Sequence, residues 1–178
     1  MQLVWFRKDL RITDNPALYQ ACLNGPCMAV YFVTPKQWQA HNIAPIQIDL
    51  MQRALNHLSA DLGILGVQLH IIEVDYFDAI PERLLALCQA LSIKVIYANS
   101  EVEINEIERD IAVQSALQNS EVALRLYQAD CLFEPGQVQT QQGEMYKVFT
   151  PFKNRCLKIL RERNNLQLYP APQAHGCA

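Results

Sequence analysis

The sequence predicts an α/β fold: a doubly wound, five-stranded parallel sheet with helices on both faces, a Rossmann-like arrangement. Two observations lead to this fold class. Short apolar runs alternate with longer amphipathic segments through residues 1–130, as expected for strands buried on both faces and the helices that join them. The composition is that of a globular protein, because 51% of the 178 residues are hydrophobic and 19% are charged.

The first two apolar runs lie at residues 3–6 and 28–33 and are expected to be strands. Between them, Asn15 is a candidate N-cap, and Pro16 follows at the first helical position. A short helix is therefore expected from Pro16 to about Leu23.

A long helix is expected to start at Pro45 and to end at the glycines Gly63 and Gly66. The apolar residues that recur near helical spacing in it are Ile46, Leu50, Leu55, Leu58 and Leu62. A third strand is expected at 67–74, and a further amphipathic helix at about 77–91.

The fourth and fifth strands are expected at 93–98 and 122–127. The helix between them is marked by the apolar residues Ile104, Ile107, Ile111 and Leu117. Beyond residue 130 the alternation stops. We therefore expect one α/β domain over residues 1–130, followed by a connector over 131–178 with one helix near 151–163.

Charge is unevenly distributed along a chain whose net charge is −3. Residues 101–121 contain six acids and one base, whereas residues 145–163 contain six bases and one acid. Either stretch can be a solvated helix face, and the basic one can alternatively dock on a partner. The six cysteines include no CxxC pair, which favours reduced thiols in a cytoplasmic protein. We expect no membrane span, because no apolar run approaches 18 residues.

The usual catalytic motifs are absent from the sequence. It contains no GxGxxG or GxxxxGK[ST] phosphate loop and no GxSxG elbow, and its histidines do not have HxxxH spacing. We expect no catalytic residue and no metal ligand in this chain. In a doubly wound sheet, a ligand would lie at the carboxyl ends of the strands. The residues alone thus predict a domain that binds a small molecule without reacting with it.

Four segments, in order, resemble the DNA photolyase and cryptochrome family. The first is residues 5–18, which begin Trp-Phe-Arg-Lys-Asp-Leu-Arg. The second, 34–42, is similar to folate-binding bacterial photolyases. The third and fourth are 102–110 and 144–153. The resemblance covers nearly the whole chain.

The resemblance implies the N-terminal antenna domain of a deoxyribodipyrimidine photolyase, a carbon–carbon lyase for light-driven repair of pyrimidine dimers. The expected antenna is 5,10-methenyltetrahydrofolate, with a deazaflavin as the alternative. FAD, the repair chemistry and most of the contact with UV-damaged DNA would belong to a helical C-terminal domain beyond this sequence. This chain alone is then expected to be inactive, and the parent protein to be a monomer. The alternatives are the same domain of a cryptochrome photoreceptor and an unrelated nucleotide-binding module.

The resemblance assigns antenna contacts to Asn105, Glu106 and His41. Glu106 is chemically suitable because a carboxylate can accept the adjacent N–H and amino donors of a pterin ring, and Asn105 can donate and accept beside it. Without the resemblance, Glu106 would be read as a helix-dipole residue paired with Arg109. The charged residues Arg7, Asp9, Arg11 and Asp14 are expected to form a structural ion-pair network at the sheet edge.

Overall fold

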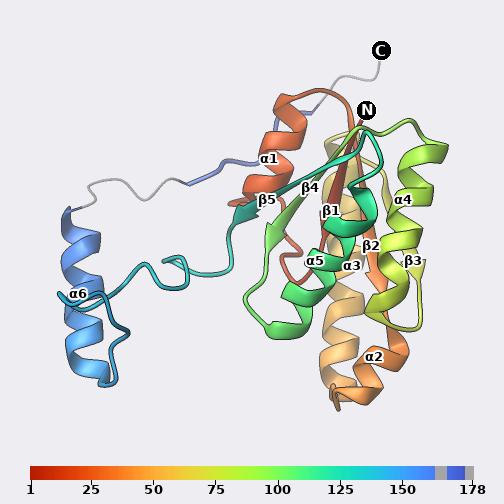
Figure 1. The fold of residues 1–178 in the computed structure, drawn as a ribbon. Coiled ribbons are helices and arrows are strands. Elements are labelled where there is room, and N and C mark those ends of the chain that lie inside the picture. Colours follow the sequence, from red (N-terminus) through yellow and green to blue (C-terminus); the bar gives the residue numbers. More distant parts are fainter. Residues whose placement is uncertain (163–167, 175–178) are drawn as a thin grey trace.

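The computed structural model describes residues 1–162 and 168–174, and it contains the predicted five-stranded parallel sheet (Figure 1). The strands are β1 (Gln2–Phe6), β2 (Cys27–Val33), β3 (Leu69–Glu73), β4 (Val95–Ser100) and β5 (Ala123–Gln128). They lie in the order β3-β2-β1-β4-β5, and every neighbouring pair is parallel. The chain reverses its direction of travel across the sheet at β1, which creates a topological switch point between β1 and β4.

The central strand β1 is buried on both faces. Its residues Leu3, Val4, Trp5 and Phe6 are at most 2% exposed. Because successive side chains point to opposite faces, Leu3 and Trp5 join one core cluster, whereas Val4 and Phe6 join the other. This two-sided burial explains why the strand is a continuous apolar run without alternation.

Helices cover both faces of the sheet, which confirms the doubly wound fold (Figure 1). The first core cluster joins the sheet to α1 (Pro16–Leu23) and α3 (Pro45–Ile64). The second joins it to α4 (Ile80–Ala90) and α5 (Ile104–Leu117). Two short elements complete the domain: the helix α2 (Pro35–Ala40) after β2, and the 3₁₀ turn η1 (Phe77–Ala79) before α4.

The predicted cap of α1 is confirmed. The Asn15 side chain accepts a hydrogen bond from the backbone N–H of Leu18 at 3.0 Å, and Pro16 occupies the first turn. Asn15 Oδ1 also accepts from Asn99 Nδ2 at 2.8 Å, at the end of β4. The cap therefore ties α1 to the carboxyl edge of the sheet as well as starting the helix.

Several residues used to recognise the helices do not face the core. In α3, Leu55, Leu58 and Leu62 are buried as expected, but Ile46 and Leu50 are exposed. The first turns of α3 extend past the strand ends beside α2, so no sheet lies against them (Figure 1).

In α5 the apolar residues Ile104, Ile107 and Ile111, which marked the helix in the sequence, are likewise exposed. The buried face of this helix is instead formed by Arg109, Asp110, Val113 and Leu117. An apolar period predicted the helix correctly but did not indicate its buried face, because two charged residues take positions that hydrophobic residues usually occupy.

The chain beyond β5 leaves the sheet. Residues 129–148 lead to α6 (Phe149–Glu162), which stands apart from the rest and has no buried residue (Figure 1). This helix matches the one expected near 151–163, although Arg163 lies outside the described residues. The division into a domain at 1–130 and a connector at 131–178 stays a prediction. None of the helices in the described part is both long and apolar enough to cross a lipid bilayer.

A short segment at 168–174 returns to the domain. The backbone N–H of Asp14 donates to the carbonyl of Tyr169 at 2.7 Å, and the rings of Tyr19 and Tyr169 meet edge to face with centroids 5.5 Å apart. The segment is therefore attached beside the start of α1.

Candidate functional site

A cavity of about 180 Å³ lies at the carboxyl edge of the sheet, where β1, β2 and the loop after β4 come together. This edge is where open α/β sheets bind their ligands. The apolar and aromatic lining residues are Trp5, Phe6, Tyr31, Phe32, Trp38, Ile43, Met51, Phe77 and Ile80. The polar ones are Arg7, Lys8, Thr34, Gln37, His41, Glu101, Asn105, Glu106 and Arg109.

The structure brings all three expected site residues to this one cavity. Asn105 and Glu106 lie in the first turn of α5, and His41 follows the last residue of α2. His41 is exposed, and its Nε2 lies 3.0 Å from Gln37 Nε2. Residues from two distant parts of the sequence thus share one site, while their role in binding stays a prediction.

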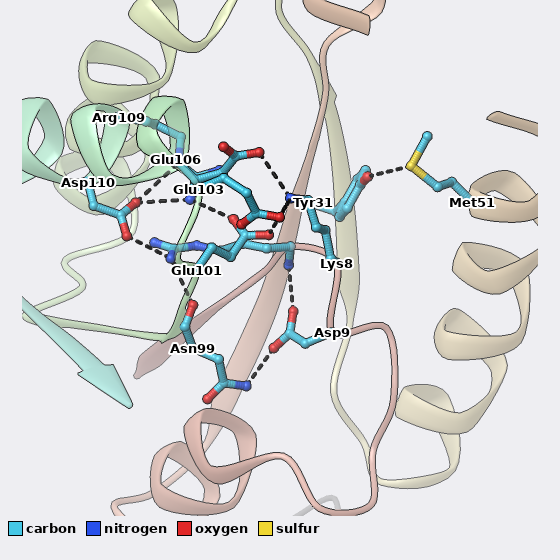
Figure 2. A network of polar contacts seen from close by, with 11 residues as sticks. Lys8, Asp9, Tyr31, Met51, Asn99, Glu101, Glu103, Glu106, Arg109 and Asp110 are labelled. Atoms are coloured by element: carbon cyan, nitrogen blue, oxygen red, sulfur yellow. Dashed lines mark hydrogen bonds and ion pairs between the residues drawn. The ribbon is translucent and has the colours of Figure 1, made fainter. Parts of the chain in front are cut away.

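Glu106 is paired with Lys8 and not with Arg109, the partner considered for it without the resemblance. Lys8 Nζ donates to Glu106 Oε1 at 3.1 Å and to Glu103 Oε1 at 2.6 Å, and it lies 3.8 Å from Glu101 Oε1 (Figure 2). The Glu106 side chain is 13% exposed and Lys8 is about half exposed. The ammonium of Lys8, in the loop after β1, therefore forms ion pairs with three carboxylates of the segment from the end of β4 to the start of α5.

Arg109 belongs instead to a buried charge cluster beneath Lys8. Its Nη2 donates to Glu101 Oε2 at 2.9 Å and to Asp110 Oδ1 at 3.0 Å. Arg7 Nη1 donates to Asp110 Oδ2 and to the carbonyl oxygen of Asn99, both at 2.8 Å. The cluster fastens the start of α5 to the ends of β1 and β4.

The expected ion-pair network of Arg7, Asp9, Arg11 and Asp14 forms differently. Arg7 pairs with Asp110 of α5 and with none of the other three side chains. Asp9 accepts hydrogen bonds from the backbone N–H of Arg7 and from Asn99, while Arg11 donates to the backbone carbonyl of Asp14. The ion pair of this motif is made by Arg7 with a residue about a hundred positions away, which spacing within the motif could not reveal. A purely structural role of the motif stays a prediction.

Burial and pairing shift the pKa values of the charged residues at the site in opposite directions. Desolvation raises the pKa of Glu101, and the neighbouring Arg109 guanidinium only partly offsets this. Burial, and then repulsion from Arg109, lower the pKa of Arg7. Partial burial disfavours the Lys8 ammonium, but hydrogen bonds to Glu103 and Glu106 outweigh it and raise the pKa of Lys8. The lysine therefore remains charged at neutral pH.

Aromatic rings form much of the cavity wall. The guanidinium groups of Arg7 and Arg109 lie 4.1 and 4.8 Å from the centre of the Trp5 ring. Tyr31 donates a weak hydrogen bond to Met51 Sδ at 3.8 Å, and burial raises the pKa of Tyr31 to about 12. These groups offer flat apolar surface beside fixed hydrogen-bond partners.

Sequence reasoning missed several of the residues at this site. Lys8 stood inside a recognised motif, but only the packing of β1 against β4 shows its three carboxylate partners. Glu101 counted as one acid of an acidic stretch, and the structure shows it to be 8% exposed. Tyr31, near the end of the second strand, and Trp38, shortly after that strand, could have been noticed as aromatic residues at the sheet edge.

The polar and aromatic lining of the cavity suits the binding of a small, flat ligand. Carboxylates and amides beside aromatic walls suit a flat heterocycle with N–H donors. Among residues 1–162 and 168–174, no group of three or more His, Cys, Asp or Glu could hold a metal ion. His175 and Cys177 lie outside this part of the chain.

The chain is similar to known proteins over nearly its whole length. The family model described as DNA photolyase matches residues 2–173. The deoxyribodipyrimidine photo-lyase of Escherichia coli is 44% identical over 162 residues, which are 90% of this chain and 34% of that protein. The chain thus spans about a third of the length of such relatives.

Solved structures agree on the fold. A bacterial class III photolyase from Agrobacterium tumefaciens superposes with a TM-score of 0.74 at 26% identity, covering 99% of this chain and 35% of that one. A cryptochrome from Synechocystis superposes with a TM-score of 0.82 at 24% identity, and the match covers 98% of this chain and 36% of the cryptochrome chain.

Proposed function

Because this chain belongs to the DNA photolyase family, we propose that it is the light-harvesting part of a deoxyribodipyrimidine photolyase. Its ligand would be a reduced folate, 5,10-methenyltetrahydrofolate, held in the cavity at the carboxyl edge of the sheet. FAD and the pyrimidine-dimer site would belong to a helical domain beyond this chain. This chain alone would not repair DNA.

The observation that carries this proposal is the meeting of Asn105, Glu106 and His41 at one aromatic-walled cavity. Glu106 Oε1 already accepts a hydrogen bond from the Lys8 ammonium, which orients the carboxylate as an acceptor. A pterin ring presents adjacent N–H and amino donors, which such a carboxylate can accept together. The first turn of α5 places Glu106 where the helix dipole also stabilises its negative charge.

The size of the cavity limits what it can enclose. At about 180 Å³ it is smaller than the roughly 300–1,000 Å³ of sites that surround a drug-sized ligand. We therefore assign it to the pterin head, with Trp38 and Tyr31 as apolar walls, and place the rest of the folate outside it. When bound, the folate would absorb light and pass the excitation energy on to FAD.

The remaining parts of the proposal concern the whole parent protein. Its partners would be its own FAD domain and UV-damaged DNA, and it would act as a cytoplasmic monomer. The net charge of −3 describes only this chain and carries no argument against DNA as the parent's substrate.

The proposal is tested with Glu106→Gln in the full-length protein. Removing the charge should lower folate content about tenfold or more, because hydrogen bonds to a charged acceptor contribute about 1.5–3 kcal/mol. FAD content should not change. Glu108→Gln is the matched control, since Glu108 is exposed on the same helix and does not line the cavity. Chromophores released by denaturation are identified by mass spectrometry. Equal folate in E106Q, or a deazaflavin in the wild type, contradicts the assignment.

The same preparations separate repair from signalling. A photolyase restores dimer-containing DNA under blue or near-ultraviolet light, whereas a cryptochrome photoreceptor does not. An FAD-loaded parent without light-dependent repair would favour the photoreceptor.

A further inference from the structure

Lys8 has more carboxylate neighbours than it can bind equally. Its Nζ lies 2.6 Å from Glu103, 3.1 Å from Glu106 and 3.8 Å from Glu101, so only the first two are hydrogen-bonded. The three acids differ in surroundings: the Glu103 side chain is 47% exposed, Glu106 13% and Glu101 6%. The ammonium thus lies between the solvated Glu103 and two acids that line the cavity, Glu106 and the more deeply buried Glu101.

The buried acid keeps one acceptor free. Glu101 Oε2 is held by Arg109 Nη2 at 2.9 Å, which fixes the carboxylate. Glu101 Oε1 is buried and has no hydrogen-bond partner among the described residues. A buried carboxylate oxygen without a donor is unfavourable by about 1–3 kcal/mol. Lys8 is the donor placed to supply the bond.

Lys8 can reach it by a small movement. An ammonium carries three N–H donors on a flexible four-carbon stem, and about half of this side chain is in solvent. A shift of about 1 Å would bring Nζ from 3.8 Å to hydrogen-bond distance of Glu101 Oε1.

We infer that Lys8 is an exchangeable counterion at the proposed folate cavity. It pairs with the Glu106 carboxylate when no ligand is bound, and it moves to the Glu101 carboxylate when N–H donors of the ligand form hydrogen bonds with Glu106. The inference rests on the proposed function, since it concerns binding at the same carboxylate. Lys8 is a positioning residue in this scheme, because it acts on binding through its carboxylate partners Glu106 and Glu101. Glu101 supplies the alternative partner, so the buried acid contributes to affinity by receiving the Lys8 ammonium.

A double-mutant cycle in the full-length protein tests the exchange, with 5,10-methenyltetrahydrofolate as the probe and its dissociation constant as the readout. Glu101→Gln removes the alternative anion and should weaken folate binding about tenfold, within the range of coupling energies between contacting residues. Lys8→Met removes the competing ammonium and should bind folate as tightly as the wild type or more tightly. In the K8M background, E101Q should have no further effect.

A control variant and two contrary results decide whether Lys8 exchanges between Glu106 and Glu101. Lys36→Met is the matched control, because Lys36 is an equally exposed lysine that pairs with Asp75 and does not line the cavity. If K8M weakens binding, or if E101Q costs the same affinity in both backgrounds, the inference is wrong while the folate site stands. A wild-type protein without folate affinity overturns the proposed function and the inference together. If E101Q does not fold, Glu101→Asp replaces it, because the shorter side chain withdraws its carboxylate from Lys8.

Discussion

Arg7 carries a positive charge into the interior, and a single residue, Asp110, neutralises it directly. The Arg7 side chain is 2% exposed, and its Nη1 lies 2.8 Å from Asp110 Oδ2. Arg7 Nε and Nη2 have no hydrogen-bond partner among the described residues, and the guanidinium lies over the Trp5 ring. Because Arg109 is a second buried cation nearby, the pair depends on the charge of Asp110.

At this residue scale we predict that Asp110→Asn is strongly destabilising. Removing one partner of a buried ion pair leaves an uncompensated charge, and the free energy of unfolding should fall by about 3 kcal/mol or more. Urea denaturation followed by circular dichroism measures the change. Asp61→Asn, at an exposed position of α3, should change it by less than about 0.5 kcal/mol. A D110N protein as stable as D61N would show that the pair is not needed for the fold.

The candidate site was predictable only where its residues form contiguous motifs. Asn105 and Glu106 are adjacent in sequence and begin a helix after a strand, so their place at the sheet edge follows from topology alone. The partnership of Lys8 with Glu101 and Glu106 depends on β1 lying beside β4, which brings together residues more than ninety positions apart. No local pattern encodes such a contact.

Among the elements, α1 shows how a capping residue can also connect layers. Asn15 is 1% exposed and caps the helix through its Oδ1, which also accepts a hydrogen bond from Asn99. Its Nδ2 donates to the carbonyl oxygen of Arg11 at 3.1 Å. One amide therefore fixes the loop after β1, the start of α1 and the end of β4.

We predict that Asn15→Ala costs more than loss of an ordinary N-cap. Such a loss lowers stability by about 0.5–2 kcal/mol, and the buried Asn99 amide would lose one of its acceptors as well. The expected decrease in the free energy of unfolding is thus about 2–3 kcal/mol. Asn24→Ala is the control, since Asn24 is the exposed residue after the same helix. Equal effects of N15A and N24A in urea denaturation would refute the cross-link to β4.

At this scale the sequence determines where elements lie better than which way they face. All five strands and the helices α1, α3, α4 and α5 fall within a few residues of their expected positions, because turn residues and apolar runs mark them locally. The short helix α2 was not expected. The apolar residues of α5 did not indicate its buried face, because Arg109 and Asp110 are buried there through pairing with Glu101 and Arg7. Burial of paired charges depends on partners in other elements, so the buried face of such a helix has no apolar periodicity in the sequence.

Over the whole molecule, the compact α/β part and the segment that follows it differ in how they are held. The four helices α1, α3, α4 and α5 pack on the sheet through two buried clusters. In contrast, α6 has no buried residue and stands apart (Figure 1). Its basic residues and Phe149 are exposed, and docking of this stretch on a partner stays a prediction.

This difference predicts an order of cleavage in limited proteolysis of this chain by trypsin. A protease needs an unfolded stretch of backbone, and a helix without tertiary packing opens more readily than one packed on a sheet. Lys153, Arg155 and Lys158 in α6 should therefore be cut at least about tenfold faster than Arg53 in α3 or Arg83 in α4. All five are basic residues on helices, so the comparison isolates packing. Mass spectrometry of timed digests measures the order, and a urea-unfolded sample should lose it. If the α6 sites resist trypsin as long as Arg53 and Arg83 do, α6 is packed in solution and the division of the molecule at the end of β5 is wrong.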